Sequence, residues 1–71
     1  MTSARVVLDS SVLKQASYAL DETLELEFRT GAVYRYFGVP YVVFENLILA
    51  TSKGACFNRN IRDNFRHQRV A

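Results

Sequence analysis

The chain has 71 residues, of which 49% are hydrophobic and 13% aromatic, so a disordered protein is excluded and one small globular domain spanning 1–71 is predicted. It contains one cysteine, Cys56, and one histidine, His67, which excludes an internal disulfide and a structural zinc site with four protein ligands. No apolar stretch approaches the ~20 residues of a membrane span, and the N-terminus lacks the apolar core of a signal peptide. We therefore expect a cytoplasmic protein with no membrane partner, metal, cofactor or evident small-molecule substrate.

The net charge of +2 is unevenly distributed along the chain. Residues 1–50 carry four basic and six acidic side chains, whereas 51–71 carry five basic side chains and one acidic side chain. This asymmetry favours an anionic partner for the C-terminal part, although a solvated helix face would carry the same charges. The five basic residues are Lys53, Arg59, Arg62, Arg66 and Arg69.

Three strands are predicted in the first half of the chain. Residues 1–10 are expected to form an N-terminal extension or a short strand, with 6–8 as the candidate segment. A strand of uncertain facing follows over 12–18, and 24–29 alternate apolar and charged side chains as a half-buried strand does. The next strand covers 32–39. Because short connections make neighbouring strands antiparallel, we predict a three-stranded antiparallel meander.

The loop between the second and third of these strands can be closed in two ways. A two-residue loop of Thr30 and Gly31 would require a positive φ at Thr30, which a β-branched residue resists, and would bring Arg35 beside Leu26 on the apolar face. A three-residue loop that also includes Arg29 needs a positive φ only at Gly31, as in a bulged turn. We favour the three-residue loop because it satisfies backbone, core and charge together.

In the favoured register, the two tyrosines of the third strand lie on the core side. Tyr34 and Tyr36 then share a face with the leucines of the preceding strand, with their hydroxyls near the rim. We therefore interpret them as core residues of the family motif described below, not as an open platform for stacking bases. The predicted facing pairs are Leu24 with Tyr36, Leu26 with Tyr34, and the complementary charges Glu25 with Arg35.

A broadly apolar helix is predicted after the meander. Pro40 suits its first turn, and Gly54 is expected to follow its last turn as the C′ residue, with Lys53 near the negative end of the helix dipole. Apolar residues extend round most of this helix, so the sheet alone cannot cover them. The surplus favours a protein partner or a second copy of the chain. The residues left over are Val42, Val43 and Leu49.

A final helix is predicted over 55–70, because its large apolar residues recur at every fourth position and form one stripe for docking. Its arginines step by three, four and three residues and form a second stripe on the flank of the first. Asp63 is expected to pair with Arg59 or Arg66, and 67–71 to fray as a tail. The apolar stripe consists of Phe57, Ile61 and Phe65, and the basic stripe of Arg59, Arg62, Arg66 and Arg69.

These residues in this order resemble the KTSC domain, from about Ser11 onward. That small domain is named for its occurrence at the C-terminus of some lysyl-tRNA synthetases, and it also occurs alone as a short bacterial or phage protein. Its central mark is a Tyr-x-Tyr motif, matched here by Tyr34 and Tyr36. Cys56 stands where a bulkier residue is expected, and Phe65 where a tyrosine is usual. The other matched positions are Phe28, Gly31, Val39, Pro40, Ser52, Gly54, Phe57 and Ile61.

The fold class predicted is α+β, with the meander followed by two C-terminal helices packed on one face. We expect a small binding module and not an enzyme, because the sequence offers no catalytic set of a nucleophile, a general base and a residue that orients the base. The resemblance to a synthetase domain implies RNA as a partner. The basic C-terminal residues Lys53, Arg59, Arg62, Arg66 and Arg69 would contact its phosphates. The alternative is a protein-interaction or homodimerisation module that uses the apolar helix face.

Overall fold

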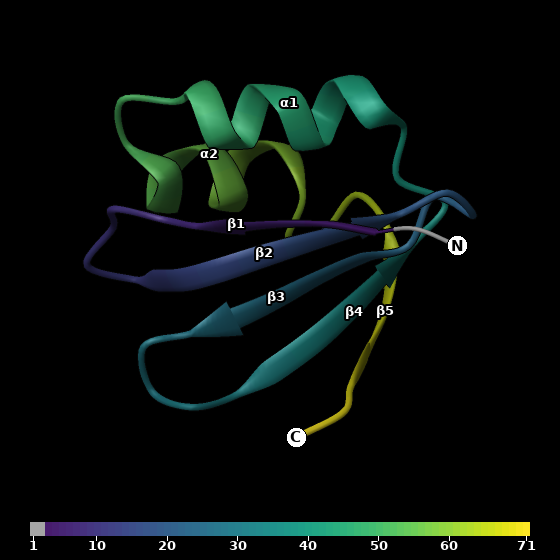
Figure 1. Ribbon diagram of the computed structural model, residues 1–71, viewed down its shortest axis with the longest axis horizontal. Coiled ribbons are helices and arrows are strands. Elements are labelled where there is room, and N and C mark those ends of the chain that lie inside the picture. Colours follow the sequence, from purple (N-terminus) through teal and green to yellow (C-terminus); the bar gives the residue numbers. More distant parts are fainter. Residues whose placement is uncertain (1–2) are drawn as a thin grey trace.

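The computed structural model describes residues 3–71 and shows an α+β fold whose five antiparallel strands form one sheet in the order β1-β2-β3-β4-β5. Helices α1 and α2 lie on one face of this sheet, as predicted (Figure 1). The sheet extends beyond the predicted three-stranded meander by one strand at each edge. The elements are β1 (Ser3–Val7), β2 (Leu13–Ala19), β3 (Leu24–Phe28), β4 (Val33–Phe37), α1 (Tyr41–Leu49), α2 (Lys53–Asn60) and β5 (Arg66–Arg69).

The N-terminal segment forms a strand, which was one of its two predicted states. β1 pairs antiparallel with β2 over its whole length. The connection between them is held by Arg29, whose Nε donates to the carbonyl of Ser10 (3.0 Å) and whose guanidinium also donates to the carbonyl of Leu8 (3.2 Å). Leu8 itself is buried, so this connection adds to the core as well as to the edge of the sheet.

The β3–β4 hairpin has the predicted three-residue register. Leu24 faces Tyr36, Leu26 faces Tyr34, and Glu25 lies opposite Arg35, whose Nε donates to the Glu25 carboxylate at 3.0 Å. Gly31 has a φ of +97°, the left-handed conformation that this loop requires and that glycine adopts without strain. The prediction is confirmed because only this loop places leucines and tyrosines on one face and the ion pair on the other.

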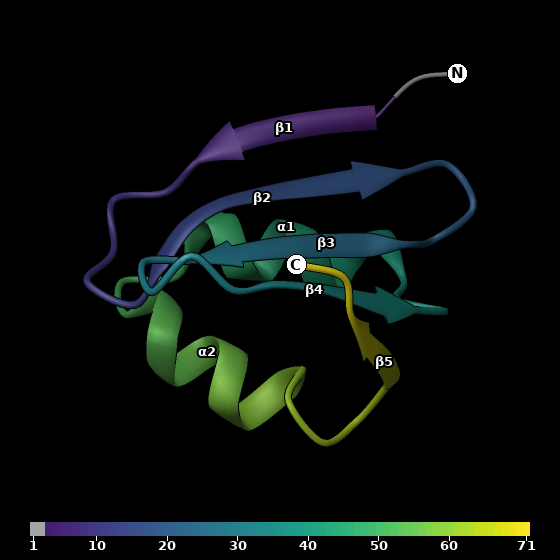
Figure 2. The same cartoon turned by 90° about the horizontal axis from the view of Figure 1, so that it is seen from below.

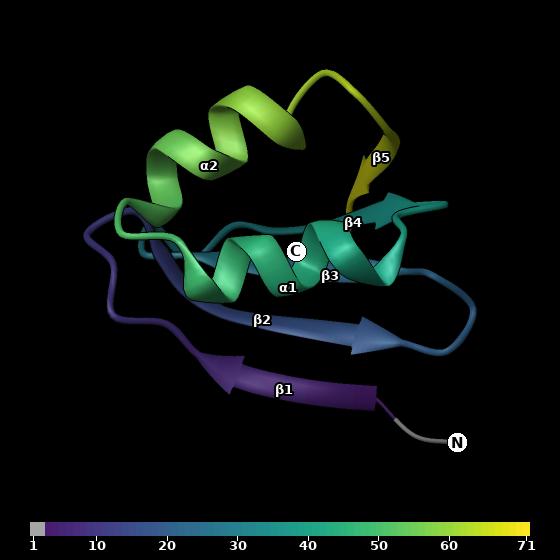
Figure 3. The same cartoon turned by 90° about the horizontal axis from the view of Figure 1, so that it is seen from above.

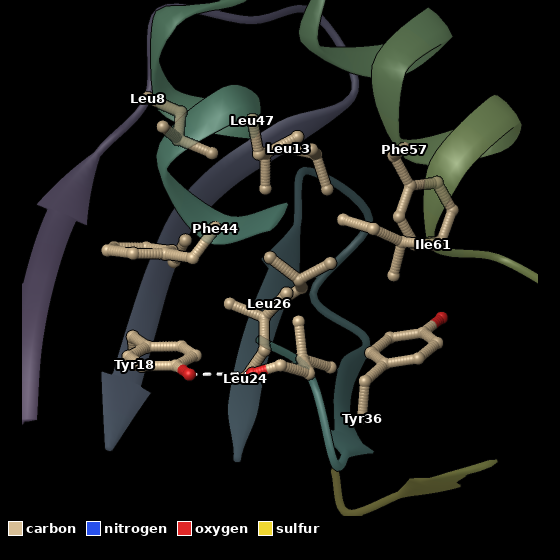
Figure 4. Packing of buried hydrophobic residues seen from close by; sticks show 12 residues of the cluster. Leu8, Leu13, Tyr18, Leu24, Leu26, Tyr36, Phe44, Leu47, Phe57 and Ile61 are labelled. Carbon is tan, nitrogen blue, oxygen red and sulfur yellow. Dashed lines mark hydrogen bonds between the residues drawn. The ribbon is translucent and has the colours of Figure 1, made fainter. Parts of the chain in front are cut away.

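The core lies between the helix-facing side of the sheet and the two helices (Figure 4). Phe44 and Leu47 are the buried residues of α1, at a spacing of three that places both on one side of the helix. The Phe44 ring stacks on that of Tyr18 with centroids 5.1 Å apart. The buried hydrophobic residues are Leu8, Leu13, Ala16, Tyr18, Leu24, Leu26, Tyr36, Val39, Phe44, Leu47, Phe57 and Ile61.

Helix α1 is shorter than predicted, and α2 begins where α1 was expected to end. Ser52 is the N-cap of α2, and its Oγ accepts a hydrogen bond from the backbone amide of Ala55 (3.3 Å). Gly54 is therefore a residue of the first turn of α2, and its prediction as a C′ residue was wrong. The missing side chain has a packing reason, because a Cβ on Gly54 would lie 3.2 Å from Cγ2 of Val12.

The prediction of a final helix over 55–70 was also wrong beyond its first two turns. α2 ends at Asn60, and the amides of Ile61 and Arg62 both donate to the carbonyl of Phe57. The side chain of Asn64 folds back and donates to the carbonyl of Asn60 at 2.8 Å, which satisfies one of the last carbonyl groups of the helix. The chain then turns and returns to the sheet.

Residues predicted to fray instead form the edge strand β5, which pairs antiparallel with β4. Beyond β5, the amide of Val70 donates to the carbonyl of Val33 at 2.8 Å, and the amide of Val33 donates to the carbonyl of Ala71. Figure 2 shows β5 and α2 on the β4 side of the sheet, and Figure 3 shows α1 over the middle strands. The physical reason for the error is that β4 offers a free row of backbone groups, which outweighs a helical pattern in the side chains.

Neither helix of the described chain has the length and hydrophobicity needed to cross a lipid bilayer.

Candidate functional site

The five basic residues predicted as one surface are divided among four places. Lys53 opens α2, and its Nζ donates to the carbonyl of Ala50 at 2.9 Å, so it caps the end of α1 as its predicted position near the helix dipole implied. Arg59 is exposed in the last turn of α2. Arg66 lies on the side of the sheet away from the helices, with its guanidinium 5.6 Å from the Phe37 ring centroid. The predicted row of four arginines along one helix does not exist.

Arg62 and Arg69 are brought together on the helix-facing side of the sheet. Both line an open groove of about 770 Å³ between the end of α2 and strands β3, β4 and β5. Neighbouring residues of β5 point to opposite faces of the sheet, so His67 and Arg69 reach this groove whereas Arg66 does not. We call it the aromatic groove. Its lining residues are Phe28, Thr30, Ala32, Tyr34, Tyr36, Phe57, Arg62, Asp63, His67 and Arg69.

Five rings in contact form the floor of the aromatic groove. Phe28 and Phe57 meet edge to face at 5.3 Å between centroids, and each also meets one tyrosine edge to face, Phe28 with Tyr34 and Phe57 with Tyr36. The imidazole of His67 lies 5.2 Å from the Tyr36 ring and 6.1 Å from the Tyr34 ring. Phe57 and Tyr36 are the buried members of this cluster and His67 is the exposed one, so part of the aromatic surface faces solvent.

Tyr36 carries a buried ring with a hydroxyl directed into the groove. The residue is only 3% exposed, but its hydroxyl forms no hydrogen bond within residues 3–71 and is not among the buried polar atoms there, so the oxygen is accessible from the groove. Figure 4 shows this hydroxyl pointing away from Leu24 and Leu26. Burial raises the pKa of the Tyr36 phenol, and so does neighbouring Tyr34, while the charge of Arg62 lowers that pKa. The hydroxyl is thus a neutral donor and acceptor at physiological pH.

Tyr34 is half-buried and lies nearer the open side of the groove. The guanidinium of Arg69 is 6.0 Å from its ring centroid, a cation–π distance. The Nε of Arg69 donates to the carbonyl of Ala71 at 2.9 Å, which fixes the side chain over the groove. Both tyrosines of the motif were predicted on the core side, and both are there. The structure adds that they also line the aromatic groove.

Asp63 is the acidic residue of the aromatic groove. Its predicted ion pair with Arg59 or Arg66 is absent from the ion pairs of residues 3–71. The prediction assumed a continuous helix, in which positions 59, 63 and 66 share one face. Because the helix ends at Asn60, these side chains diverge and Arg62 and Asp63 both point toward the groove.

The lone cysteine and histidine lie in different settings. Cys56 is half-buried on α2, and the side-chain amide of Asn60 donates to its Sγ at 3.4 Å. His67 is exposed on β5, and its Nδ1 is 3.4 Å from the carbonyl of Phe65. Among residues 3–71, no three histidine, cysteine, aspartate or glutamate side chains gather as a metal site would require.

Sequence reasoning missed the part of the groove that depends on β5. His67 was predicted in a frayed tail and Arg69 on a helix edge, and Phe28 was named only as a position that matches the family. Their side chains converge because β5 pairs with β4 so that Tyr36 faces His67 and Tyr34 faces Arg69. The four residues of β5 are all polar, so the sequence carries no apolar alternation that could have indicated a strand here.

Comparison with known proteins identifies one family. The sequence matches the family model of the KTSC domain over residues 9–65. It is 44% identical over 64 residues to a lysine–tRNA ligase from Nostoc punctiforme, and a ligase from Trichormus variabilis is 38% identical over the same length. These alignments cover 89% of this chain, but the chain spans only 11% of the length of either ligase.

Two matches of similar size extend over nearly the whole chain. An uncharacterized protein from Stutzerimonas stutzeri is 40% identical over 68 residues, which is 93% of this chain and 96% of that protein. The crystal structure of a KTSC domain protein from Yersinia pestis superposes with a TM-score of 0.92 at 30% identity, covering 99% of this chain and 100% of that one. The arrangement of strands and helices described above is therefore shared with a solved member of the family.

Proposed function

Since this chain belongs to the KTSC domain family, which is also matched within lysine–tRNA ligases, we propose that it is a non-catalytic module that binds RNA in the aromatic groove. The ligases act on tRNA, and an attached domain of this kind has RNA within reach. The association alone does not identify a binding surface. The surface is proposed from the side chains that the fold brings together.

The observation that supports RNA binding is the convergence of arginines and aromatic rings in one groove. Arg62 and Arg69 provide two guanidinium groups of the kind that bind phosphate oxygens, and they line the groove together with His67 and the two tyrosines. Aromatic rings beside a basic track are the common elements of proteins that bind single-stranded nucleic acid. Asp63 offsets one of these charges, which predicts weak and strongly salt-dependent binding.

The test is a salt titration of binding to unfractionated tRNA with two charge-matched double variants. Arg62→Gln with Arg69→Gln removes two charges from the groove, and we expect it to weaken binding and to reduce the slope of log K against log salt by about 1–2. Arg59→Gln with Arg66→Gln removes two charges outside the groove and should bind nearly as wild type. Equal losses in both variants would contradict a site in the groove, and no binding by wild type at low salt would contradict RNA binding itself.

A second candidate function is self-association through the outer side of α1. Val42 and Leu49 are seven residues apart, which places them on one side of the helix, and they are 55% and 75% exposed. Exposed apolar pairs of this kind occur at interfaces. Sedimentation at several concentrations should then show a dimer, which Val42→Gln with Leu49→Gln should convert to a monomer. A wild-type monomer at every concentration would exclude this candidate.

A further inference from the structure

We propose that the aromatic groove binds an unpaired nucleotide of RNA, with its base stacked on the rings of Tyr34 and His67 and its flanking phosphates held by Arg62 and Arg69. This inference rests on the proposed RNA binding and specifies which form of RNA is bound. It distinguishes a site that reads single-stranded loops and ends from a charged surface that accepts any double helix.

The preference for an unpaired nucleotide follows from where the aromatic surface lies. The exposed rings lie in a groove between α2 and the edge of the sheet, with arginines at the rim. In a double helix both faces of each base are covered by neighbouring bases, so a duplex offers its phosphates and groove edges to a protein but not a base face. Only a nucleotide outside a helix can place its base on Tyr34 or His67 while its phosphates reach the rim.

Ring geometry indicates stacking on the cluster and not insertion into it. Tyr34, Tyr36 and His67 are already in mutual contact, with centroid separations of 5.2–6.4 Å, so no base fits between them. The half-buried Tyr34 and the exposed His67 are the two members of this trio with accessible surface. A base can therefore cover their groove-facing side, as bases do on the aromatic residues of other single-strand binders.

The Tyr36 hydroxyl gives the groove one free hydrogen-bonding group. The Tyr36 ring is buried, but its hydroxyl has no partner among the described residues and is not one of their buried polar atoms, so the oxygen is open to the groove. A base that enters the groove can bond to this hydroxyl, because a base edge offers both donors and acceptors. The same hydroxyl contributes nothing to the folded protein alone, so Tyr36→Phe separates binding from stability.

Of the two arginines of β5, only Arg69 is placed to contact a phosphate in the groove, and Arg66 serves as its matched control. They belong to the same strand and point to opposite faces of the sheet, so only Arg69 reaches the groove. Arg62 lines the same groove from the turn after α2, where its charge acts on Tyr36, whereas the guanidinium of Arg69 lies against the Tyr34 ring. Phosphates on either side of a stacked base would each meet one arginine.

The experiment uses the ring protons of His67, the only histidine, as a reporter that needs no assignment. The full chain is titrated at low salt with oligouridylate, whose bases are unpaired, and separately with a blunt-ended RNA duplex of equal phosphate content. Oligouridylate should shift the His67 ring signals saturably and bind at least tenfold more tightly than the duplex. Tyr36→Phe should weaken oligouridylate binding roughly three- to tenfold, the range expected for one hydrogen bond, with an unchanged melting temperature.

Each other outcome has a definite meaning. Equal affinity for duplex and oligouridylate, or RNA binding that leaves the His67 signals unmoved, would overturn this inference while the proposed RNA binding stands. The absence of binding to either RNA and to tRNA would overturn both. Replacement of Tyr34 by leucine keeps an apolar side chain in the hairpin but removes the ring. Its melting curve identifies any loss of fold, and a folded Tyr34→Leu protein with wild-type oligouridylate affinity would also count against stacking.

Discussion

The hydroxyl of Tyr18 donates a 2.6 Å hydrogen bond to the carbonyl of Val39 and so joins the end of β2 to the segment that leads into α1. Both residues are buried, and the amide of Val39 donates in turn to the carbonyl of Glu22 at 2.9 Å. Both backbone polar groups of Val39, the residue before Pro40, are thus bonded, the carbonyl by Tyr18 of β2 and the amide by Glu22 of the β2–β3 turn. This contact fixes where α1 begins over the sheet.

Removal of the Tyr18 hydroxyl should destabilise the protein. Tyr18→Phe leaves the buried carbonyl of Val39 without its phenol donor, and we expect a loss of about 1–3 kcal/mol in the free energy of unfolding. Tyr36→Phe is the matched control, because the Tyr36 hydroxyl has no hydrogen-bond partner within residues 3–71 and is open to the groove, so its loss should change the free energy little. Urea denaturation of both variants checks this, and equal stability of Tyr18→Phe and wild type would contradict it.

Stability should fall in alkaline solution. Burial, followed by the charges of Glu22 and Asp21, raises the pKa of the Tyr18 phenol above its ordinary value of 10.0, and burial also raises that of Tyr36. Above pH 10 the unfolded chain therefore loses these protons before the folded chain does, and the free energy of unfolding decreases as pH rises. Below pH 10 the two phenols should contribute no pH dependence.

Thermal melts between pH 8 and pH 12, a range that brackets the ordinary phenol pKa of about 10, measure this dependence. Tyr18→Phe should show a shallower alkaline decline than wild type, because one of the two shifted phenols is gone. An identical decline in the two proteins would show that Tyr18 does not carry it.

The N-cap of α2 should be worth a measurable part of the stability. Ser52→Ala removes the acceptor for the amide of Ala55, and we expect a cost of about 1 kcal/mol, within the range of 0.5–2 kcal/mol for such caps. Ser52→Asp retains an acceptor and adds a favourable charge at the helix N-terminus, so it should keep or raise stability. Chemical denaturation distinguishes the two variants, and equal losses in both would contradict the capping role.

Backbone amides of the C-terminal strand should exchange slowly with solvent. The β4–β5 ladder and the Val70–Val33 bond engage backbone groups of both strands, so hydrogen exchange measured by NMR should show protection at hydrogen-bonded positions of β5. The exposed Gly38, whose amide has no hydrogen-bond acceptor among residues 3–71, provides an unprotected reference in the same spectrum. Exchange of every β5 amide at the rate of Gly38 would show that the edge strand does not persist in solution.

The hairpin could be predicted from sequence because three independent constraints agree there. A glycine stands where the loop needs a positive φ, leucines alternate with glutamates, and one register alone pairs Glu25 with Arg35. Each constraint is local, and so the correct pairing follows without knowledge of the rest of the fold. The same applies to the buried face of α1, where Phe44 and Leu47 stand at a helical spacing.

The region after Asn60 could not be predicted in the same way. Phe57, Ile61 and Phe65 have the spacing of a helix, but the helix ends between the first two of them. The turn that follows directs Ile61 and Phe65 into the same core, so the spacing alone does not show where the helix stops. Strand β5 is fully exposed and consists of Arg66, His67, Gln68 and Arg69, so it has no apolar alternation to mark it. It forms a strand because β4 offers a free edge, which is a property of the tertiary structure that the local sequence of β5 does not reveal.

The composition of the aromatic groove depends on the length of the turn that precedes β5. Alternate residues of that strand serve opposite faces, so a slip of one position against β4 would withdraw His67 and Arg69 and present Arg66 and Gln68 in their place. A single insertion or deletion in 62–64, between the buried Ile61 and the partly buried Phe65, would then change the ligand preference in one step, while the core and the Tyr-x-Tyr motif stayed in place. Relatives that differ in the length of this short stretch are thus expected to diverge in what they recognise long before they diverge in shape.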